Sequence, residues 1–425
     1  MSEACDRVVE ACGPLTGEIT PPGDKSISHR CLMLGALANG PVRMRRLLDS
    51  ADVRATAHAM EALGATLSID GDAVVLTPPE RFADPSDVID CGNSGTTIRL
   101  LTGLIAAENV FAVLNGDASL RGRPMSRVVG PLRLMGAKIE GRLSNTKAPL
   151  CIRGPLTRPM AHDLPLSSAQ VKSALLLGGR HVGVSLRETR SSRDHTERLL
   201  TQMGARLKTT PDGWMQLRPF ETLDPFDVMV PGDLSSASFW MVAGSIIPGS
   251  EIVLRNVGIN PTRAGVIDAL KQMGARIEVQ TLPGDGEPTA DLRIKARELV
   301  GTTIEGDLAL RSIDELPVLA VAAAFATGET IIRDVAELRV KESDRIARTV
   351  DGLKAMGVEV DEQPDGMIIQ GGSPKGPGVV DASGDHRIAM AFAVAGLAAG
   401  PVTLLQADSS TSYPGFWSDL EALRA

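Results

Sequence analysis

Short clusters of Lys, Arg and hydroxyl residues give this sequence several candidate anion-binding sites. In the first cluster Lys25 precedes Ser26, and Arg30 follows four positions after Ser26. Residues four apart lie on one face of a helix. An ammonium, a hydroxyl and a bidentate guanidinium together can bind a phosphate or carboxylate group. Taken alone, the cluster is better explained by an ordinary capped helix with solvated charges.

A second cluster, residues 91–99, combines two glycines with Asn, Ser and Thr (CGNSGTTIR). Glycines such as Gly95 allow the backbone to come close to an anion at the start of a helix. The segment lacks the GxxxxGK[ST] pattern of a P-loop, which removes the strongest marker of kinase chemistry. A glycine-rich turn without a ligand is the alternative.

Three further candidates are arginines in apolar or turn segments. Arg123 precedes a proline, Arg193 lies in the polar segment SRDH, and Arg387 begins a very apolar stretch. A buried arginine needs an anionic partner, which either the protein or a ligand must supply.

A further cluster combines basic residues with two carboxylates, Glu342 and Asp314. If residues 337–345 are helical, Lys341 and Arg345 lie on one face. Glu342 then lies three positions from Arg345. Asp314 precedes an apolar run and is either a helix N-cap or a carboxylate that faces a cleft. For residues 337–345 alone, a solvent-exposed helix with salt bridges is the alternative.

Other chemistries lack their sequence markers. The six histidines are scattered, and HExxH, paired-cysteine and GxSxG patterns do not occur. We therefore expect no metal and no cofactor. The five cysteines are odd in number and widely spaced, which indicates free thiols in a reducing compartment. Cys91 is expected to be a small packed residue rather than a nucleophile.

The composition also excludes several classes of partner. A net charge of −8 and 3% aromatic residues argue against a nucleic-acid-binding protein. The longest uncharged apolar run, Ile388–Ala399, is too short to cross a membrane. The first twelve residues lack the apolar core of a signal peptide. A cytoplasmic protein without membrane contact is expected.

The elements that must position these residues are predicted by two interleaved repeats. A phrase of Leu or Met, Gly and Ala or Val recurs at helix ends, where Gly is the expected cap. Its glycines are Gly64, Gly136, Gly204, Gly274 and Gly357. Polar N-cap segments precede apolar stretches in a second series. These segments begin at Asp24, Asn93, Ser167, Asp233, Ile313 and Gly384.

The two series predict six units of about 70 residues, arranged as two domains of three units each. Only five end phrases occur, so both termini are expected to complete the sixth unit. Residues 13–21 would then form a strand of the C-terminal domain. The predicted domains are 1–22 with 231–425, which contains both termini, and an inserted domain at 23–230.

The clusters as a set, in this order along nearly the whole chain, resemble the 5-enolpyruvylshikimate-3-phosphate (EPSP) synthase family, in particular its class II branch. The matching segments are GDKSISHR, GNSGTTIRLLTG, RPMSRV, SSAQVKSALLL, RDHTE, ELRVKESDR and DHRIAM. The resemblance implies an inside-out α/β barrel of two domains. Each domain would hold three βαβαββ repeats, with the active site in the cleft between the domains.

The resemblance implies a site residue by residue. Shikimate 3-phosphate contacts are implied for Lys25, Ser26, Arg30, Ser168, Ala169, Gln170, Arg193, Asp314 and Lys341. Phosphoenolpyruvate contacts are implied for Lys25, Gly95, Arg123, Gln170, Arg345 and Arg387.

The implied reaction transfers the enolpyruvyl group of phosphoenolpyruvate to the 5-hydroxyl of shikimate 3-phosphate, as part of chorismate and aromatic amino-acid biosynthesis. Asp314 and Glu342 would move the protons, and Lys25 would assist at the hydroxyl. Which carboxylate moves which proton stays open. The family resemblance also implies a monomer.

The sequence departs from the pattern of the better-known class at three positions. Leu100 replaces a proline, Glu337 replaces an asparagine, and Thr411 lies where many members carry a lysine that contacts the substrate. Gly95 is retained, which implies room for the herbicide glyphosate. Two alternatives are the related transferase acting on UDP-N-acetylglucosamine and a non-catalytic anion-binding protein. The first usually carries a reactive cysteine, and no cysteine lies near residues 121–127.

Overall fold

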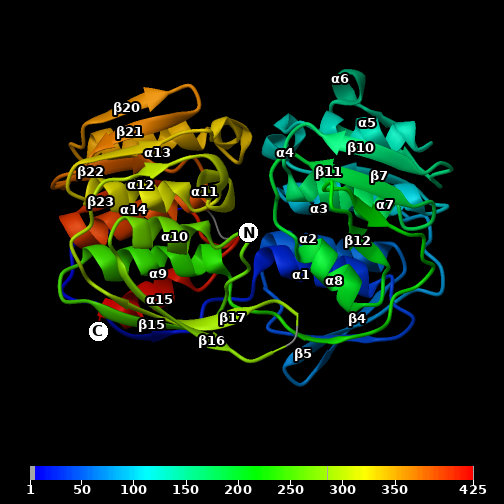
Figure 1. The fold of residues 1–425 in the computed structure, drawn as a ribbon, viewed down its shortest axis with the longest axis horizontal. Coiled ribbons are helices and arrows are strands. Elements are labelled where there is room, and N and C mark those ends of the chain that lie inside the picture. Colours follow the sequence, from blue (N-terminus) through cyan, green and yellow to red (C-terminus); the bar gives the residue numbers. More distant parts are fainter. Residues whose placement is uncertain (1–4, 285, 425) are drawn as a thin grey trace. The chain divides into compact units, whose positions relative to one another are not determined.

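The computed structural model describes residues 5–284 and 286–424. The chain forms two compact units (Figure 1). One is continuous, from Gly23 to Val230, and the other combines the N-terminal segment up to Pro22 with the chain from Pro231 onward. Strands and helices alternate in both units, and the strands of the described residues form six small sheets. The α/β class predicted from the repeats is confirmed.

The sheets of the continuous unit share one topology: a parallel pair at one edge, followed by two antiparallel strands. Their orders are β14 (Asp227–Met229), β3 (Val42–Arg45), β5 (Ala73–Thr77), β4 (Thr66–Asp70); β6 (Ile89–Asp90), β7 (Phe111–Asn115), β9 (Lys147–Arg153), β8 (Lys138–Gly141); and β10 (Met160–Leu164), β11 (Val184–Glu188), β13 (Met215–Leu217), β12 (Leu207–Thr209). Its helices are α1 (Lys25–Gly35), α2 (Ala51–Ala62), α3 (Gly95–Ala107), α4 (Ala118–Gly122), α5 (Ser126–Leu134), α6 (Arg142–Asn145), α7 (Ala169–Gly178) and α8 (His195–Gln202).

The discontinuous unit repeats this topology, with three strands in its last sheet. The orders are β2 (Thr16–Ile19), β15 (Glu251–Gly258), β17 (Thr289–Lys295), β16 (Arg276–Leu282); β18 (Thr303–Ile304), β19 (Glu329–Ile332), β21 (Gly366–Gln370), β20 (Val360–Gln363); and β22 (Gly378–Asp381), β23 (Val402–Ala407), β1 (Cys5–Val9). Its helices are α9 (Leu234–Ile246), α10 (Gly265–Gln272), α11 (Gly306–Arg311), α12 (Leu316–Ala324), the 3-10 helix η1 (Ala336–Val340), α13 (Arg345–Ala355), α14 (His386–Ala399) and α15 (Phe416–Arg424).

The termini complete the discontinuous unit, as the repeat count predicts. Strand β1 pairs antiparallel with β23, and β2 pairs in parallel with β15. The expected strand within residues 13–21 is therefore confirmed as β2.

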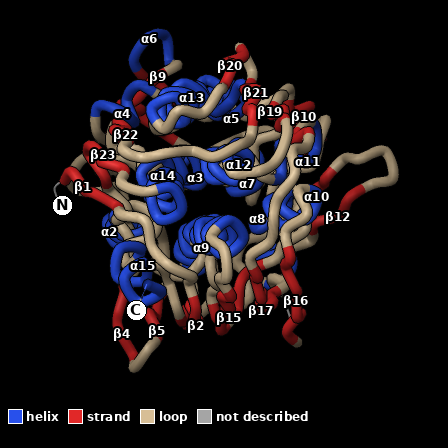
Figure 2. Tube along the Cα trace, turned by 90° about the vertical axis from the view of Figure 1, so that its left-hand side faces the viewer, coloured by secondary structure: helices blue, strands red, loops and turns tan. Residues whose placement is uncertain are grey.

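Helices occupy the interior of each unit, because some of them are apolar on every side. In the discontinuous unit α9, α12 and α14 contact one another while the strands lie around them (Figure 2). All nine residues of α12 are buried. In the continuous unit α3 packs closely on α7. A helix without a polar face gains stability only in such a position, with the half-exposed sheets outside it.

The predicted helix boundaries are largely confirmed. Asp24, Ser94, Ser168, Asp233 and Asp385 are N-cap residues, and four of them, all except Ser168, accept a backbone hydrogen bond from the first turn. All five glycines of the end phrase have positive φ, between 73° and 110°. Left-handed backbone of this kind is readily available only to glycine.

Two boundary predictions need correction. The N-cap of α12 is Glu315 rather than Asp314. Residues 337–345 are not one helix: η1 ends at Val340, and α13 begins only at Arg345 with Asp344 as its cap. The polar residues between η1 and α13 lie in a bend, so their side chains do not share one face of a helix.

The packing of α3 on α7 predicts the effect of one methyl group. A Cβ added to Gly103 would lie 1.9 Å from the backbone oxygen of Ala174, whereas a Cβ on Gly35 would meet Val42 at an ordinary 3.5 Å. We expect Gly103→Ala to lower the free energy of unfolding by about 3 kcal/mol because two backbones must separate. Gly35→Ala, the matched control, should change it by less than about 1 kcal/mol. Urea unfolding measures both, and equal stabilities would contradict this account of the interface.

Candidate active site

The first candidate cluster lies at the start of α1. Lys25 is the first residue of the helix, and its ammonium lies 2.5 Å from Oδ2 of Asp52 on α2. Asp24 accepts a hydrogen bond from the backbone N–H of Ile27, which fixes the first turn. The Lys25 side chain is 16% exposed, so an anion can reach the ammonium and compete with Asp52 for it.

Arg30 is buried and joins three helices. Its Nε donates to Thr196 Oγ1 at 2.7 Å, Nη1 donates to the backbone oxygen of Ser26 at 2.9 Å, and Nη2 donates to Ser173 Oγ at 2.8 Å. Ser26 and Arg30 thus share the helical face that their spacing predicts. The guanidinium fixes the start of α1 relative to α7 and α8.

Gly95 begins α3 at a point where two guanidinium groups converge. A Cβ at this position would lie 2.8 Å from Arg99 Nη1 and 3.0 Å from Arg123 Nη1. Arg99 donates to Gln170 Oε1 at 2.6 Å, and Gln170 Nε2 donates to Thr96 Oγ1 at 3.0 Å. The N-terminus of α3, the guanidinium groups of Arg99 and Arg123 and the amide of Gln170 therefore lie together.

Asn93 holds the second of these arginines. Its Oδ1 accepts a hydrogen bond from Arg123 Nη2 at 2.5 Å, and its Nδ2 donates to Asp117 at 2.7 Å. Arg123 is 7% exposed. The glycine-rich segment therefore forms a turn and also holds the buried guanidinium of Arg123 in place.

Cys91, beside this segment, is buried. Burial, together with the charge of Asp90, raises the pKa of its thiol. A thiol in this environment stays protonated and is a poor nucleophile. The five cysteines, all among the described residues, form no disulfide, as their spacing predicts.

The remaining predicted residues of the continuous unit lie at the starts of α7 and α8. Ser168 is the N-cap of α7, and Ala169 and Gln170 form its first turn. Arg193 is half-buried and precedes Asp194, the N-cap of α8.

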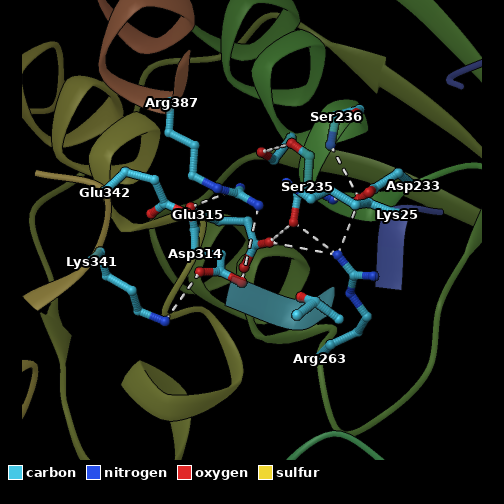
Figure 3. Close-up of polar contacts among 12 residues, drawn as sticks. Lys25, Asp233, Ser235, Ser236, Arg263, Asp314, Glu315, Lys341, Glu342 and Arg387 are labelled. Carbon is cyan, nitrogen blue, oxygen red and sulfur yellow. Dashed lines mark hydrogen bonds and ion pairs between the residues drawn. The ribbon is translucent and has the colours of Figure 1, made fainter. Parts of the chain in front are cut away.

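The second candidate cluster belongs to the discontinuous unit and surrounds Asp314 (Figure 3). Its carboxylate lies 3.7 Å from Lys341 Nζ, 3.6 Å from Arg345 Nη1 and 4.0 Å from Arg387 Nη2. Arg387 also donates to the backbone oxygen of Asp314 at 3.0 Å. Asp314 thus lies among three cations, and two of these, Lys341 and Arg387, have no closer carboxylate in this cluster and could also contact an anionic ligand.

Arg345 connects the two candidate proton-transfer residues. Its Nη2 lies 2.6 Å from Glu342 Oε2, and its Nε and Nη2 donate to the carboxylate of Asp385 at 2.8 and 3.2 Å. Burial alone would lower the pKa of Arg345, but Asp385 and Glu342 raise it, so the guanidinium stays charged. Burial likewise opposes the ionisation of Asp385, and the charge of Arg345 lowers the pKa of this carboxyl below its usual value.

Several residues of both clusters were not predicted as site residues. Asp52, Arg99 and Asp385 are partners of predicted residues from distant positions. Glu315 accepts a hydrogen bond from Ser235, whose hydroxyl in turn accepts one from the buried Arg263 at 2.8 Å. Of these residues, Arg99 could most easily have been predicted from the sequence, because it lies four positions after Gly95 in the predicted helix.

Thr411, which lies where many family members were expected to carry a lysine, is polar but uncharged. Thr411 Oγ1 donates to Asp408 at 3.1 Å. Within the described ranges 5–284 and 286–424, no helix is long and apolar enough to cross a membrane. The same residues contain no group of three or more His, Cys, Asp or Glu placed to hold a metal ion.

Comparisons with known proteins agree over the whole chain. The model of the family described as EPSP synthase (3-phosphoshikimate 1-carboxyvinyltransferase) matches residues 9–420. The 3-phosphoshikimate 1-carboxyvinyltransferase of Syntrophotalea carbinolica is 48% identical over 100% of both chains. That of Thermus thermophilus is 49% identical over 97% of this chain and 98% of its own. The solved EPSP synthase of Acinetobacter baumannii, at 39% identity and 98% coverage of both chains, superposes with a TM-score of 0.87.

Because Arg345 and Asp385 form a buried ion pair, we expect the removal of the charge on Asp385 to lower the stability of the fold strongly. In Asp385→Asn the N-cap acceptor is kept, but Arg345 loses the buried counter-ion that accepts two of its hydrogen bonds. We expect the free energy of unfolding to fall by about 3 kcal/mol at pH 7. Because the native pKa of Asp385 is lowered, its stabilisation is complete above the unfolded pKa of about 3.9 and is lost as pH falls through the lower native value.

Guanidinium unfolding between pH 7 and pH 3 tests this, with Asp361→Asn at an exposed position of β20 as the matched control. The difference between Asp385→Asn and the native chain should shrink at the acid end. A difference that is absent at pH 7, or that grows on acidification, would contradict the assignment.

Proposed function

The chain belongs to the EPSP synthase family, and from this premise we propose how its residues perform the reaction. The family's enzymes transfer the enolpyruvyl group of phosphoenolpyruvate to the 5-hydroxyl of shikimate 3-phosphate and release phosphate. The observation that carries the proposal is the cluster around Asp314. There both candidate carboxylates lie within 4.0 Å of cations that suit an anionic substrate.

In the addition step, the 5-hydroxyl oxygen attacks C2 of phosphoenolpyruvate while a proton is delivered to the methylene carbon. We assign the methylene proton to Glu342, and the removal of the hydroxyl proton to Asp314 with the help of Lys25. The product is a tetrahedral ketal that still carries the phosphate group. Proton transfer by positioned side chains contributes roughly 10²–10⁴-fold to such rates.

In the elimination step, the new methyl group loses a proton and the bond from C2 to the phosphate oxygen breaks. The electrons of the C–H bond form the enol ether, and phosphate leaves. Glu342, now ionised, is suited to take this proton back. The scheme uses side chains only, so we propose that the enzyme needs neither a metal nor a cofactor.

The basic residues divide between the two substrates. We assign phosphoenolpyruvate to Arg345, Arg387 and the arginine-lined surface at Gly95, because its carboxylate and phosphate need several cations. Shikimate 3-phosphate is assigned to a larger set. This set is Lys25, Ser26, Arg30, Ser168, Ala169, Gln170, Arg193, Asp314 and Lys341. We further infer a monomer that acts in the cytoplasm.

The direct test is release of phosphate from phosphoenolpyruvate in the presence of a chelator. One reaction contains shikimate 3-phosphate and a parallel reaction contains UDP-N-acetylglucosamine. We expect release only with shikimate 3-phosphate. Release only with the nucleotide sugar would assign the chain to the related transferase, and release with neither would favour a non-catalytic anion-binding protein.

The proton-transfer roles predict a loss of turnover in Asp314→Asn and Glu342→Gln. Each change keeps the shape of the side chain and removes its ionisable group, so kcat should fall by roughly 10²-fold or more. Steady-state rates at saturating substrates measure this. The matched control is Glu359→Gln, at an exposed position of the same unit, which should keep its turnover. A variant at Asp314 or Glu342 with native kcat would remove that residue from the mechanism.

A further inference from the structure

The continuous unit contains a buried ammonium that the proposed reaction does not use. Lys172, in the first turn of α7, is 1% exposed. Its Nζ lies 2.8 Å from Glu188 Oε2, 2.6 Å from Glu197 Oε1 and 3.2 Å from the backbone oxygen of Ser192. A lysine ammonium has three N–H donors, and here each of them has one acceptor.

The three acceptors come from three different elements. Glu188 is the last residue of β11, Ser192 belongs to the loop 189–194, and Glu197 lies in the first turn of α8. Lys172 therefore joins four chain segments at one point. One of these is the start of α7, two residues after Gln170.

The loop 189–194 has further bonds on both sides of this point. The Ser192 N–H donates to the same Oε2 of Glu188 at 3.2 Å. Before α7, the hydroxyl of Ser167 accepts the Arg190 N–H at 3.2 Å and donates to the Arg190 backbone oxygen at 2.5 Å. The chain is thus fixed on the N-terminal side of Arg193, and α8 begins two residues after it.

A second link runs in parallel through the next residue of α7. The Ser173 hydroxyl lies 2.6 Å from Thr196 Oγ1, and both hydroxyls accept from Arg30. Lys172 and Ser173 thus hold Glu197 and Thr196, two neighbouring residues of α8. Together they connect α8 and its preceding loop to helices whose first turns carry predicted substrate contacts.

The charges in this cluster favour a role beyond general stability. Two carboxylates and one ammonium are buried, and a cluster of this kind is often no more stabilising than an apolar core. Burial alone would lower the pKa of Lys172, but Glu197 and Glu188 raise it, so the ammonium stays charged. The cluster instead fixes geometry, because the three bonds of Lys172 Nζ determine the position of the loop backbone relative to α7, α8 and β11.

We propose that Lys172 is a positioning residue for shikimate 3-phosphate, which holds the loop 189–194 so that Arg193 reaches the substrate. This inference rests on the proposed function, because that function supplies the role of Arg193. Lys172 acts through the backbone of Ser192 and does not itself touch the substrate. Arginine cannot replace it, because a planar guanidinium does not direct three donors to these three acceptors.

The test compares Lys172→Met with the native enzyme. Losing the fixed position of one charge-assisted contact should raise the KM for shikimate 3-phosphate roughly tenfold. At saturating shikimate 3-phosphate the kcat should stay within about threefold of the native value, because Asp314 and Glu342 are unchanged. Calorimetric titration with shikimate 3-phosphate alone should show the same loss of affinity. Lys208→Met, at an exposed position of β12, is the matched control.

A general structural role predicts a different result. If Lys172 only stabilises the fold, the variant will melt at a lower temperature but bind shikimate 3-phosphate with native affinity, and the inference is overturned. If Lys172→Met does not fold, Glu188→Gln serves instead, since it keeps the ion pair of Lys172 with Glu197 and weakens the bonds of Glu188 to Lys172 and to the Ser192 N–H. It should raise the same KM, and a native KM in it would also overturn the inference. An inactive native enzyme would instead refute the proposed function.

Discussion

The burial of helices that are apolar on every side is the constraint on which this structure depends. Helices such as α12 and α14 expose almost no surface, so the residues along them are apolar and cannot contact a polar substrate. Their first turns are different, because several N–H groups there lack partners within the helix. Polar residues therefore gather at these ends, and the sites follow from this: Lys25, Gly95 and Arg387 all lie in the first two residues of a buried helix.

The same ends carry the positive pole of the helix, which favours anions. In the discontinuous unit Asp314 occupies such a position, just before α12, and three cations lie within 4.0 Å of it. In the continuous unit the start of α3 has no side chain at Gly95, and two guanidinium groups lie against it. In the mechanism that we propose, the carboxylate at one of these helix ends moves a proton, and the arginines at both ends contact the anionic substrate.

Sequence analysis could predict the features that depend on neighbouring residues. Glycine caps such as Gly274 and N-caps such as Asp233 are local signals, so the repeats, the helix starts and the completion of the last sheet by β1 were predictable. The break between η1 and α13 was not, because charged residues at helical spacing read as a helix. Long-range partners were also missed. Nothing near Lys172 in the sequence indicates that Glu188 and Glu197 will surround it.

The position of β1 and β2 affects the order in which the chain can fold during synthesis. The continuous unit consists of residues 23–230 and is complete as soon as this segment has left the ribosome. Strand β2 must wait for β15, and β1 must wait for β23 at residues 402–407. Until its own partner has been made, each of these strands has unpaired edges that other chains could join. Strand β1 therefore precedes the continuous unit in the sequence but pairs only after that unit and most of the discontinuous unit have been synthesised.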